Sequence, residues 1–292
     1  MRPTTFEDII GQTEAKDILQ IAVKSATERE AALPHILMHG PAGTGKTTFA
    51  NAIANDFDTK ILIANGVNLT NAKAILPYLA RMKHRSILFI DEIHRIRTNI
   101  QEMMYEVMED FQLTVGKKAV SRMQMKPFTV IGATTDPGLL LKPFRDRFKY
   151  NVRLTTYNDD EIAEIIAAYS LKLGLEMTED CIRNLASRCR GTPRIAIGHL
   201  EWVRDYCISK EITRPVVSDI NEAMAIRGVT SDGMTHDDRT YLAVLRQFGG
   251  PVGLKTLASA LDKDPATIET VIEPFLIKQG RIQKTSRGRQ IV

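Results

Sequence analysis

An eight-residue segment, Gly40–Thr47, carries glycines, a lysine and a threonine at the spacing G-x-x-x-x-G-K-T. Gly43 and Gly45 allow the backbone to curl, so that its N–H groups face a bound anion. The segment follows the apolar run Ile36–Met38 and precedes a helical pattern, so the positive end of a helix would face the same anion. We therefore predict a phosphate-binding loop, with Lys46 on the β- and γ-phosphates of ATP.

Two adjacent carboxylates, Asp91 and Glu92, follow the apolar run Ile87–Ile90. A buried strand would deliver both of them beside the phosphate loop. Asp91 and the Thr47 hydroxyl are the predicted ligands of Mg²⁺. Glu92 is the predicted base that orients and deprotonates the attacking water. A hydroxyl of the pair Thr134 and Thr135, after the next apolar run, would lie between the γ-phosphate and that water.

Two arginines stand where they could stabilise a transferring phosphate. Arg147 lies in the segment Pro143–Phe148, at the expected edge of a domain. An arginine that reaches a neighbouring subunit's nucleotide stabilises charge in the transition state, and a surface salt bridge is the alternative for this residue. Arg194 follows Gly191 at the start of a helix, where it could touch phosphate when a helical lid closes.

Three sequence regions differ in pattern. Residues 1–156 alternate short apolar runs with amphipathic stretches, which predicts an α/β domain whose parallel sheet is covered by helices. Residues 157–229 contain only helical patterns, and Asn158 with Glu161 predicts a capping box at the first of them. We expect a small all-helical lid there. The strands expected in the first region are Ile36–Met38, Ile61–Ala64, Ile87–Ile90 and Phe128–Ile131.

Residues 230–292 predict a winged helix. Three helical patterns precede a basic hairpin, and the third is expected to be capped by Asp264 and bent at Pro274. Lys284, Arg287 and Arg289 lie in a terminal stretch without acidic residues, which suits contact with a DNA backbone. A solvated basic surface and a winged helix that contacts protein are the open alternatives.

The composition is that of an ordinary globular chain. The 292 residues are 43% hydrophobic and carry a net charge of +4. No apolar run approaches the ~18 residues that span a membrane, and no signal-peptide pattern is present at the start. Three cysteines without a C-x-x-C pair predict a reducing, cytoplasmic location and buried thiols. The histidines lack metal-site spacing, so we expect no metal held by protein ligands alone.

Taken together, these segments resemble the AAA+ ATPases and, more closely, the RuvB family. The similarity runs over nearly the whole chain, and the segments in residues 249–254 and 273–280 are the most discriminating because they lie outside the ATPase core. The segments that carry it are FIDEIHR at 89–95, MEDF at 108–111, IGATT at 131–135, FRDRF at 144–148, RGTPRIA at 190–196, GGPVGL at 249–254 and EPFLIKQG at 273–280.

The resemblance implies a role for each matching position. Arg2 and Ile10 would form part of the adenine pocket, and Tyr157 would be the aromatic residue that meets the nucleotide. Thr135 would be sensor 1, Arg147 the arginine finger and Arg194 sensor 2. The other implied nucleotide-site residues are Gly40, Gly43, Thr44, Gly45, Lys46, Thr47 and Thr48 in the loop, and Glu109, Asp110 and Phe111 at the subunit interface.

The resemblance also implies an activity and partners. Members of the family act as hexamers around duplex DNA and drive branch migration of four-way junctions, with a RuvA-type partner and a resolvase. A hairpin around Met123 and Met125, shorter here than in the family, would contact the RuvA-type partner. Two alternatives remain open: a clamp-loader ATPase subunit, and an ATP-gated winged-helix switch on DNA without motor activity.

Overall fold

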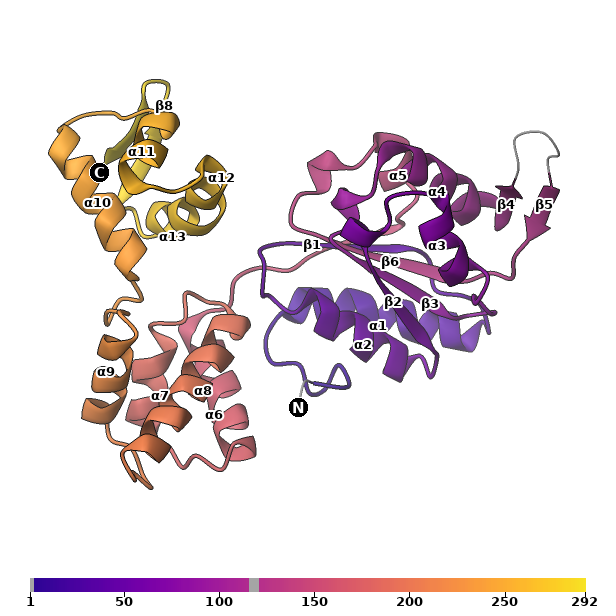
Figure 1. Cartoon of the computed structure of the whole chain (residues 1–292). Coiled ribbons are helices and arrows are strands. Elements are labelled where there is room, and N and C mark those ends of the chain that lie inside the picture. The colour runs from indigo at the N-terminus through magenta and orange to yellow at the C-terminus, as the bar shows by residue number, and fades with distance from the viewer. Residues whose placement is uncertain (1–2, 116–120) are drawn as a thin grey trace. The chain divides into compact units, whose positions relative to one another are not determined.

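The computed structural model describes residues 3–115 and 121–292 (Figure 1). It forms two compact units, residues 1–157 and 158–292, and we describe each by itself. Residues 114–126 contain four basic and no acidic side chains, and two of them, Lys117 and Lys118, lie outside the described residues. Within the part of the chain that is described, no helix is long and apolar enough to cross a membrane.

The first unit is built on a parallel sheet with the strand order β2-β3-β6-β1-β7. The predicted strands are confirmed, and β6 runs farther than expected, to Thr134. Strand β7 at the sheet edge was not expected from the sequence. The strands are β1 (Ile36–His39), β2 (Ile61–Asn65), β3 (Ile87–Asp91), β6 (Thr129–Thr134) and β7 (Tyr150–Arg153).

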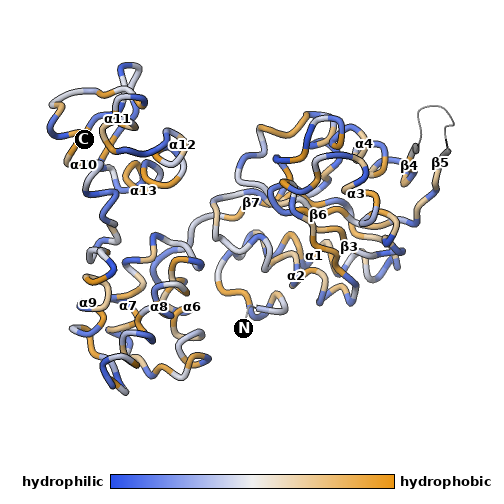
Figure 2. The backbone as a smooth tube through the Cα atoms, in the orientation of Figure 1, coloured by the Kyte–Doolittle hydropathy of each residue, from blue (hydrophilic) through white to orange (hydrophobic). Residues whose placement is uncertain are grey.

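Helices cover both faces of this sheet (Figure 1). Side chains of α1 and α2 pack on one face and those of α3, α4 and α5 on the other. The apolar colouring of the strands in Figure 2 reflects burial on both sides, which explains their continuous apolar runs. The elements are α1 (Thr13–Glu28), α2 (Lys46–Asp56), η1 (Gly66–Asn68), α3 (Ala72–Leu79), η2 (Ile93–Arg95), α4 (Thr98–Asp110), η3 (Pro137–Leu139) and α5 (Lys142–Arg145). A separate antiparallel hairpin pairs β4 (Gln112–Val115) with β5 (Ser121–Gln124).

The second unit begins with four helices. The predicted capping box at α6 is confirmed, because the Asn158 side chain accepts from the Glu161 N–H and the Glu161 carboxylate accepts from the Asn158 N–H. The cysteines, Cys181, Cys189 and Cys207, are free and buried as expected. The helices are α6 (Asp159–Lys172), α7 (Glu179–Ala186), α8 (Pro193–Ser209) and α9 (Val217–Ile226).

The rest of this unit has the helices and hairpin of a winged helix. Asp264 caps α12 as predicted, and the helix that follows widens into a π turn just before Pro274. The missing N–H of Pro274 accounts for this departure from α-helical bonding. Ile268, Val271, Ile272 and Phe275 recur at helical spacing, which predicts one buried stripe, but Val271 is exposed. The elements are α10 (His236–Phe248), α11 (Leu254–Leu261), α12 (Pro265–Thr267), η4 (Ile268–Ile272), α13 (Glu273–Lys278), β8 (Ile282–Thr285) and β9 (Gly288–Ile291).

Candidate nucleotide site and winged-helix surface

The register of the sheet brings the candidate catalytic residues to one edge. Strand β6 lies between β1 and β3, with His39 opposite Thr134 on one side and Ile90 opposite Gly132 on the other. Asp91, which follows Ile90, is therefore level with the residue before Thr134. The phosphate loop leaves β1 at this same carboxyl edge, where open α/β sheets bind ligands.

The phosphate loop has the conformation that anion binding requires. Gly40, Gly43 and Gly45 all have positive φ, which other residues rarely adopt. At Gly40 an added Cβ would lie 2.0 Å from the Leu154 carbonyl oxygen, so a side chain has no room there. Helix α2 starts at Lys46 directly after the loop and turns its free N–H groups toward it.

The electrostatics of the loop favour an anion. The buried Lys46 ammonium donates to the carbonyl oxygens of Gly40 (2.8 Å) and Pro41 (2.9 Å), which holds a positive charge at the loop. Burial and the charges of Arg153 and Lys46 lower the pKa of His39 at the end of β1. His39 is therefore neutral at pH 7, and the positive charge comes from the lysine and the arginine.

The two carboxylates are held in different ways. The Oδ1 atom of Asp91 accepts from the Glu92 N–H at 3.0 Å. Glu92 has a left-handed backbone, and its carboxylate lies 3.5 Å from Nδ1 of His94. That same nitrogen is hydrogen-bonded to the hydroxyl of Thr134 at 2.9 Å, which joins the end of β6 to the acidic pair. Thr135, the predicted sensor, is the next residue and is exposed. The residues alone predicted a hydroxyl from Thr134 or Thr135, and the family resemblance selected Thr135. No role was predicted for His94, although it lies inside a segment that carries the resemblance.

Residues near the two ends of the first unit contact the phosphate loop and one another. The buried Tyr157 hydroxyl donates to the Thr44 carbonyl oxygen at 3.3 Å. The side-chain amide of Gln12 makes two hydrogen bonds with the Thr155 backbone, at 2.7 and 3.1 Å, and so ties the segment after Ile10 to the segment before Tyr157. Gln12 ends the segment Ile9–Gln12, which resembles the family, but no role was predicted for its side chain. Arg2 lies outside the described residues.

The predicted arginine finger is held by helix α4. Arg147 forms an ion pair with Glu109, its guanidinium donates to the Tyr105 hydroxyl at 2.7 Å, and it lies 4.5 Å from the centre of the Tyr105 ring. Asp110, at the end of α4, is exposed, whereas the Phe111 ring packs edge-on against Phe128. Glu109, which the family resemblance places at the subunit interface, therefore contacts the predicted arginine finger of its own chain.

The two methionines of the predicted partner hairpin differ in exposure, although alternate residues of a continuous strand share one face. Met125 is buried and its N–H donates to the Phe111 carbonyl oxygen at 2.7 Å, whereas Met123 is 42% exposed.

The predicted sensor 2, Arg194, lies in the second unit. It is exposed at the second position of α8, where Pro193 starts the helix.

The basic hairpin of the winged helix is partly neutralised by acids from α13 and η4. Glu273 is fully buried and accepts from Arg289 Nε (2.8 Å), Lys284 Nζ (2.7 Å) and the Tyr241 hydroxyl (3.0 Å). Glu269 binds Arg289 as well, at 2.6 Å. Arg287, at the tip, is exposed and has no carboxylate partner among the described residues.

Comparison with known families divides the same chain into three matched parts. Residues 1–154 match the Holliday junction DNA helicase RuvB P-loop domain, residues 157–229 the RuvB AAA lid domain and residues 231–292 the RuvB C-terminal winged helix domain. The chain belongs to the RuvB family. It is accordingly a P-loop ATPase of the AAA+ type, with the lid and winged helix that characterise RuvB proteins.

Individual relatives agree with this membership. The "Holliday junction branch migration complex subunit RuvB" of Prochlorococcus marinus is 41% identical over 299 residues, covering all of this chain and 84% of the relative. The RuvB subunit of Fusobacterium nucleatum is 40% identical and 90% covered. The structure of the Thermotoga maritima RuvB Holliday junction branch migration motor superposes with a TM-score of 0.90 at 34% identity, covering all of this chain and 95% of that one.

Proposed function

We propose that this RuvB-family chain hydrolyses ATP and uses the energy to drive branch migration of Holliday junctions, as a hexameric ring on duplex DNA. The observation that carries the proposal is the match over the full length of the chain to subunits named for branch migration, winged helix included. A clamp-loader subunit shares the ATPase core, but the match to a RuvB winged helix favours the motor.

The proposed catalytic roles follow from the sheet edge. Lys46 binds the β- and γ-phosphates, Glu92 activates the water, and Thr135 holds that water against the γ-phosphate. Arg147 from the neighbouring subunit completes the site, as the family resemblance implies, and within its own chain its guanidinium is held by Glu109 of α4. Arg194 contacts phosphate as the lid closes. The remaining loop contacts are assigned to Gly40, Gly43, Thr44, Gly45, Thr47 and Thr48.

The residues of the loop also fit a magnesium ion. The Thr47 hydroxyl at the start of α2 and the Asp91 carboxylate at the end of β3 are hard oxygen donors, the donor set that Mg²⁺ prefers. When bound, the ion would neutralise charge on the β- and γ-phosphate oxygens. Ile10 and Tyr157 are assigned to the nucleoside side of the pocket, together with Arg2.

The proposal extends to partners. Arg287, at the hairpin tip, contacts the DNA backbone directly. Lys284 and Arg289 contact it only when a DNA phosphate displaces the carboxylates of Glu273 and Glu269. The exposed Met123 face contacts a RuvA-type protein, and a resolvase acts on the same junction. Glu109, Asp110 and Phe111 lie near the subunit interface. The free, buried cysteines support a cytoplasmic location.

The test is dissociation of a synthetic mobile four-way junction, with ATP or a non-hydrolysable analogue, and with or without a RuvA-type protein. We expect movement with ATP only. The variant Glu92→Gln is the matched control, because it removes the base while it preserves the size of the side chain. Intact ATPase activity without movement under any condition would overturn the motor and favour the clamp-loader or switch alternatives.

A further inference from the structure

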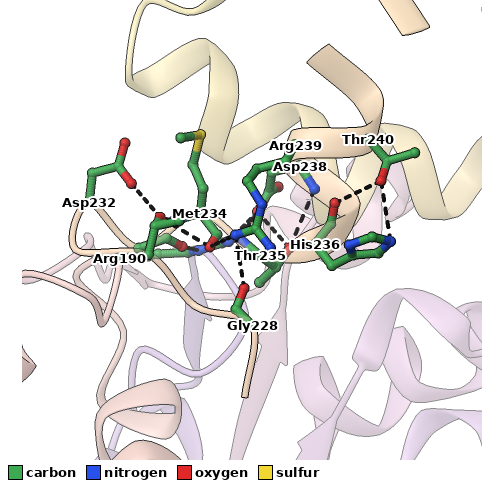
Figure 3. A network of polar contacts seen from close by, with 11 residues as sticks. Arg190, Gly228, Asp232, Met234, Thr235, His236, Asp238, Arg239 and Thr240 are labelled. Atoms are coloured by element: carbon green, nitrogen blue, oxygen red, sulfur yellow. Dashed lines mark hydrogen bonds and ion pairs between the residues drawn. The ribbon is translucent and has the colours of Figure 1, made fainter. Parts of the chain in front are cut away.

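The turn between α7 and α8 carries Arg190, whose side chain extends from the lid to the winged helix. Arg190 and Gly191 both have left-handed backbones, with φ of 55° and 65°, and they reverse the chain in front of α8. The Arg190 guanidinium then reaches residues of the winged helix: Nε donates to the Gly233 carbonyl oxygen at 2.9 Å, and a terminal nitrogen binds the Asp238 carboxylate (Figure 3).

The acceptor of this contact, the Asp238 carboxylate, is buried and held in place by further hydrogen bonds. Asp238 is 1% exposed, and its Oδ2 atom also accepts from the backbone and hydroxyl of Thr235, both at 2.6 Å, at the start of α10. The ring of Phe275, from α13, lies 4.0 Å from the Arg190 guanidinium carbon. Arg190 thus contacts two different helices of the winged helix. Ion pairs so shielded from water are strong only when every partner is in place.

The segment joining the two parts is bonded on both sides. Arg239 of α10 donates to the carbonyl oxygen of Gly228, two residues after α9, at 3.0 Å (Figure 3). At Gly233, an added Cβ would lie 3.0 Å from the Arg188 carbonyl oxygen, so the two backbones are in close approach. Residues 229–235, with Gly228, Ser231 and Gly233, have the composition of a linker, and linkers between independent domains carry few such contacts.

We propose that Arg190 is the positioning residue that couples the lid to the winged helix, so that the turn carrying the nucleotide-sensing arginine and the DNA-binding hairpin move as one body. Arg190 precedes Arg194 by four residues, across the turn that starts α8. A displacement of this turn is therefore transmitted directly to the starts of α10 and α13. The inference rests on the proposed motor function for its consequence, but the mechanical link stands on the contacts themselves.

The first test separates ATP hydrolysis from movement. Arg190→Met keeps the apolar stem and removes every donor, whereas Arg190→Lys keeps the charge that binds Asp238 but loses the planar fork. Arg183→Ala is the matched control, because Arg183 pairs with Asp160 and Glu179 entirely within the lid. We expect Arg190→Met to retain DNA-free ATPase activity within about twofold and to lose about tenfold in junction movement per ATP. The lysine variant should recover part of that loss and the control should lose none.

The second test needs no activity. Nitroxide labels at Glu211→Cys and Lys278→Cys, both exposed, report the distance between lid and winged helix in the full chain, and the native cysteines are buried. We expect a narrow distance distribution in the parent chain and a broad one with Arg190→Met. A narrow distribution in both would overturn the coupling role, as would unchanged movement per ATP. If the parent chain moves no junction while Arg190→Met broadens the distribution, the motor function fails and the mechanical role of Arg190 stands.

Discussion

Replacing Glu273 with glutamine should destabilise the winged helix more than any single change at its surface. Glu273 is fully buried, and its carboxylate accepts from Arg289, Lys284 and the hydroxyl of Tyr241. Glutamine preserves the size but leaves Arg289 without its buried counter-charge. Breaking a buried ion pair on one side costs about 3–5 kcal/mol. We expect the lower end, about 3 kcal/mol, because Glu269 remains as a second partner for Arg289.

The measurement is urea denaturation of the full chain at pH 7, with Glu269→Gln as the matched control. Glu269 is 44% exposed, and exposed pairs contribute about 0–1 kcal/mol, so the control should lie close to the parent chain. Equal losses for the two variants would refute the reasoning, because the buried carboxylate would then contribute no more than the exposed one.

Acid supplies a further check on the same carboxylate. Burial by itself would raise the pKa of Glu273, but the hydrogen bonds from Arg289, Lys284 and Tyr241 outweigh it and lower the pKa below the ordinary 4.5. A carboxylate with a lowered folded-state pKa contributes stability that is present above the unfolded-state value and is lost as the pH falls through the folded-state value. The gap in unfolding free energy between the parent chain and Glu273→Gln should therefore be full above pH 4.5 and shrink at lower pH. A gap that widens on acidification would contradict the assignment.

The remaining predictions concern the nucleotide site and the DNA surface. Glu92→Gln should bind ATP with the parent affinity and hydrolyse it at least about 10²-fold more slowly, as measured by single-turnover kinetics; parent-like turnover would remove Glu92 from its role. Arg147→Ala should be inactive alone but regain ATPase activity in mixed oligomers with a Lys46→Ala partner, and no recovery on mixing would contradict a finger acting in trans. Gly40→Ala should abolish nucleotide binding by equilibrium dialysis, because its Cβ would lie 2.0 Å from a backbone oxygen, and intact binding would refute the steric argument. Arg287→Ala should reduce the slope of log affinity for duplex DNA against log salt by about 0.9, and an unchanged slope would place the DNA contact elsewhere.

Local patterns accounted for most of the secondary structure and for the residue types of the candidate site. The strand before the phosphate loop, the capping box at Asn158 and the cap at Asp264 each depend on residues within a few positions of one another. The phosphate loop itself is contiguous. The positive φ of Gly43 and Gly45 agrees with the curled backbone that these glycines predicted from the sequence.

Contacts between distant segments could not be predicted in this way. The Gln12 amide meets the Thr155 backbone across 143 positions, and His94 meets Thr134 across 40. No spacing rule links such pairs, because chain path alone brings them together. Strand β7 escaped prediction for a related reason, since only one of its residues, Val152, is buried and its short run lacks a continuous apolar pattern.

The sequence by itself determined what kinds of group this protein has: a phosphate loop, an acidic pair, candidate arginines and a basic hairpin. Tertiary structure decided which of their charges are available. Arg147 lies against Glu109, and Arg289 and Lys284 lie against a buried glutamate, whereas Arg287 is exposed. The tie between Arg190 and Asp238 likewise exists only in the folded chain. A charge is a property of one residue and can be read from the chain, but its partner is set by packing, which brings together groups that the sequence keeps apart.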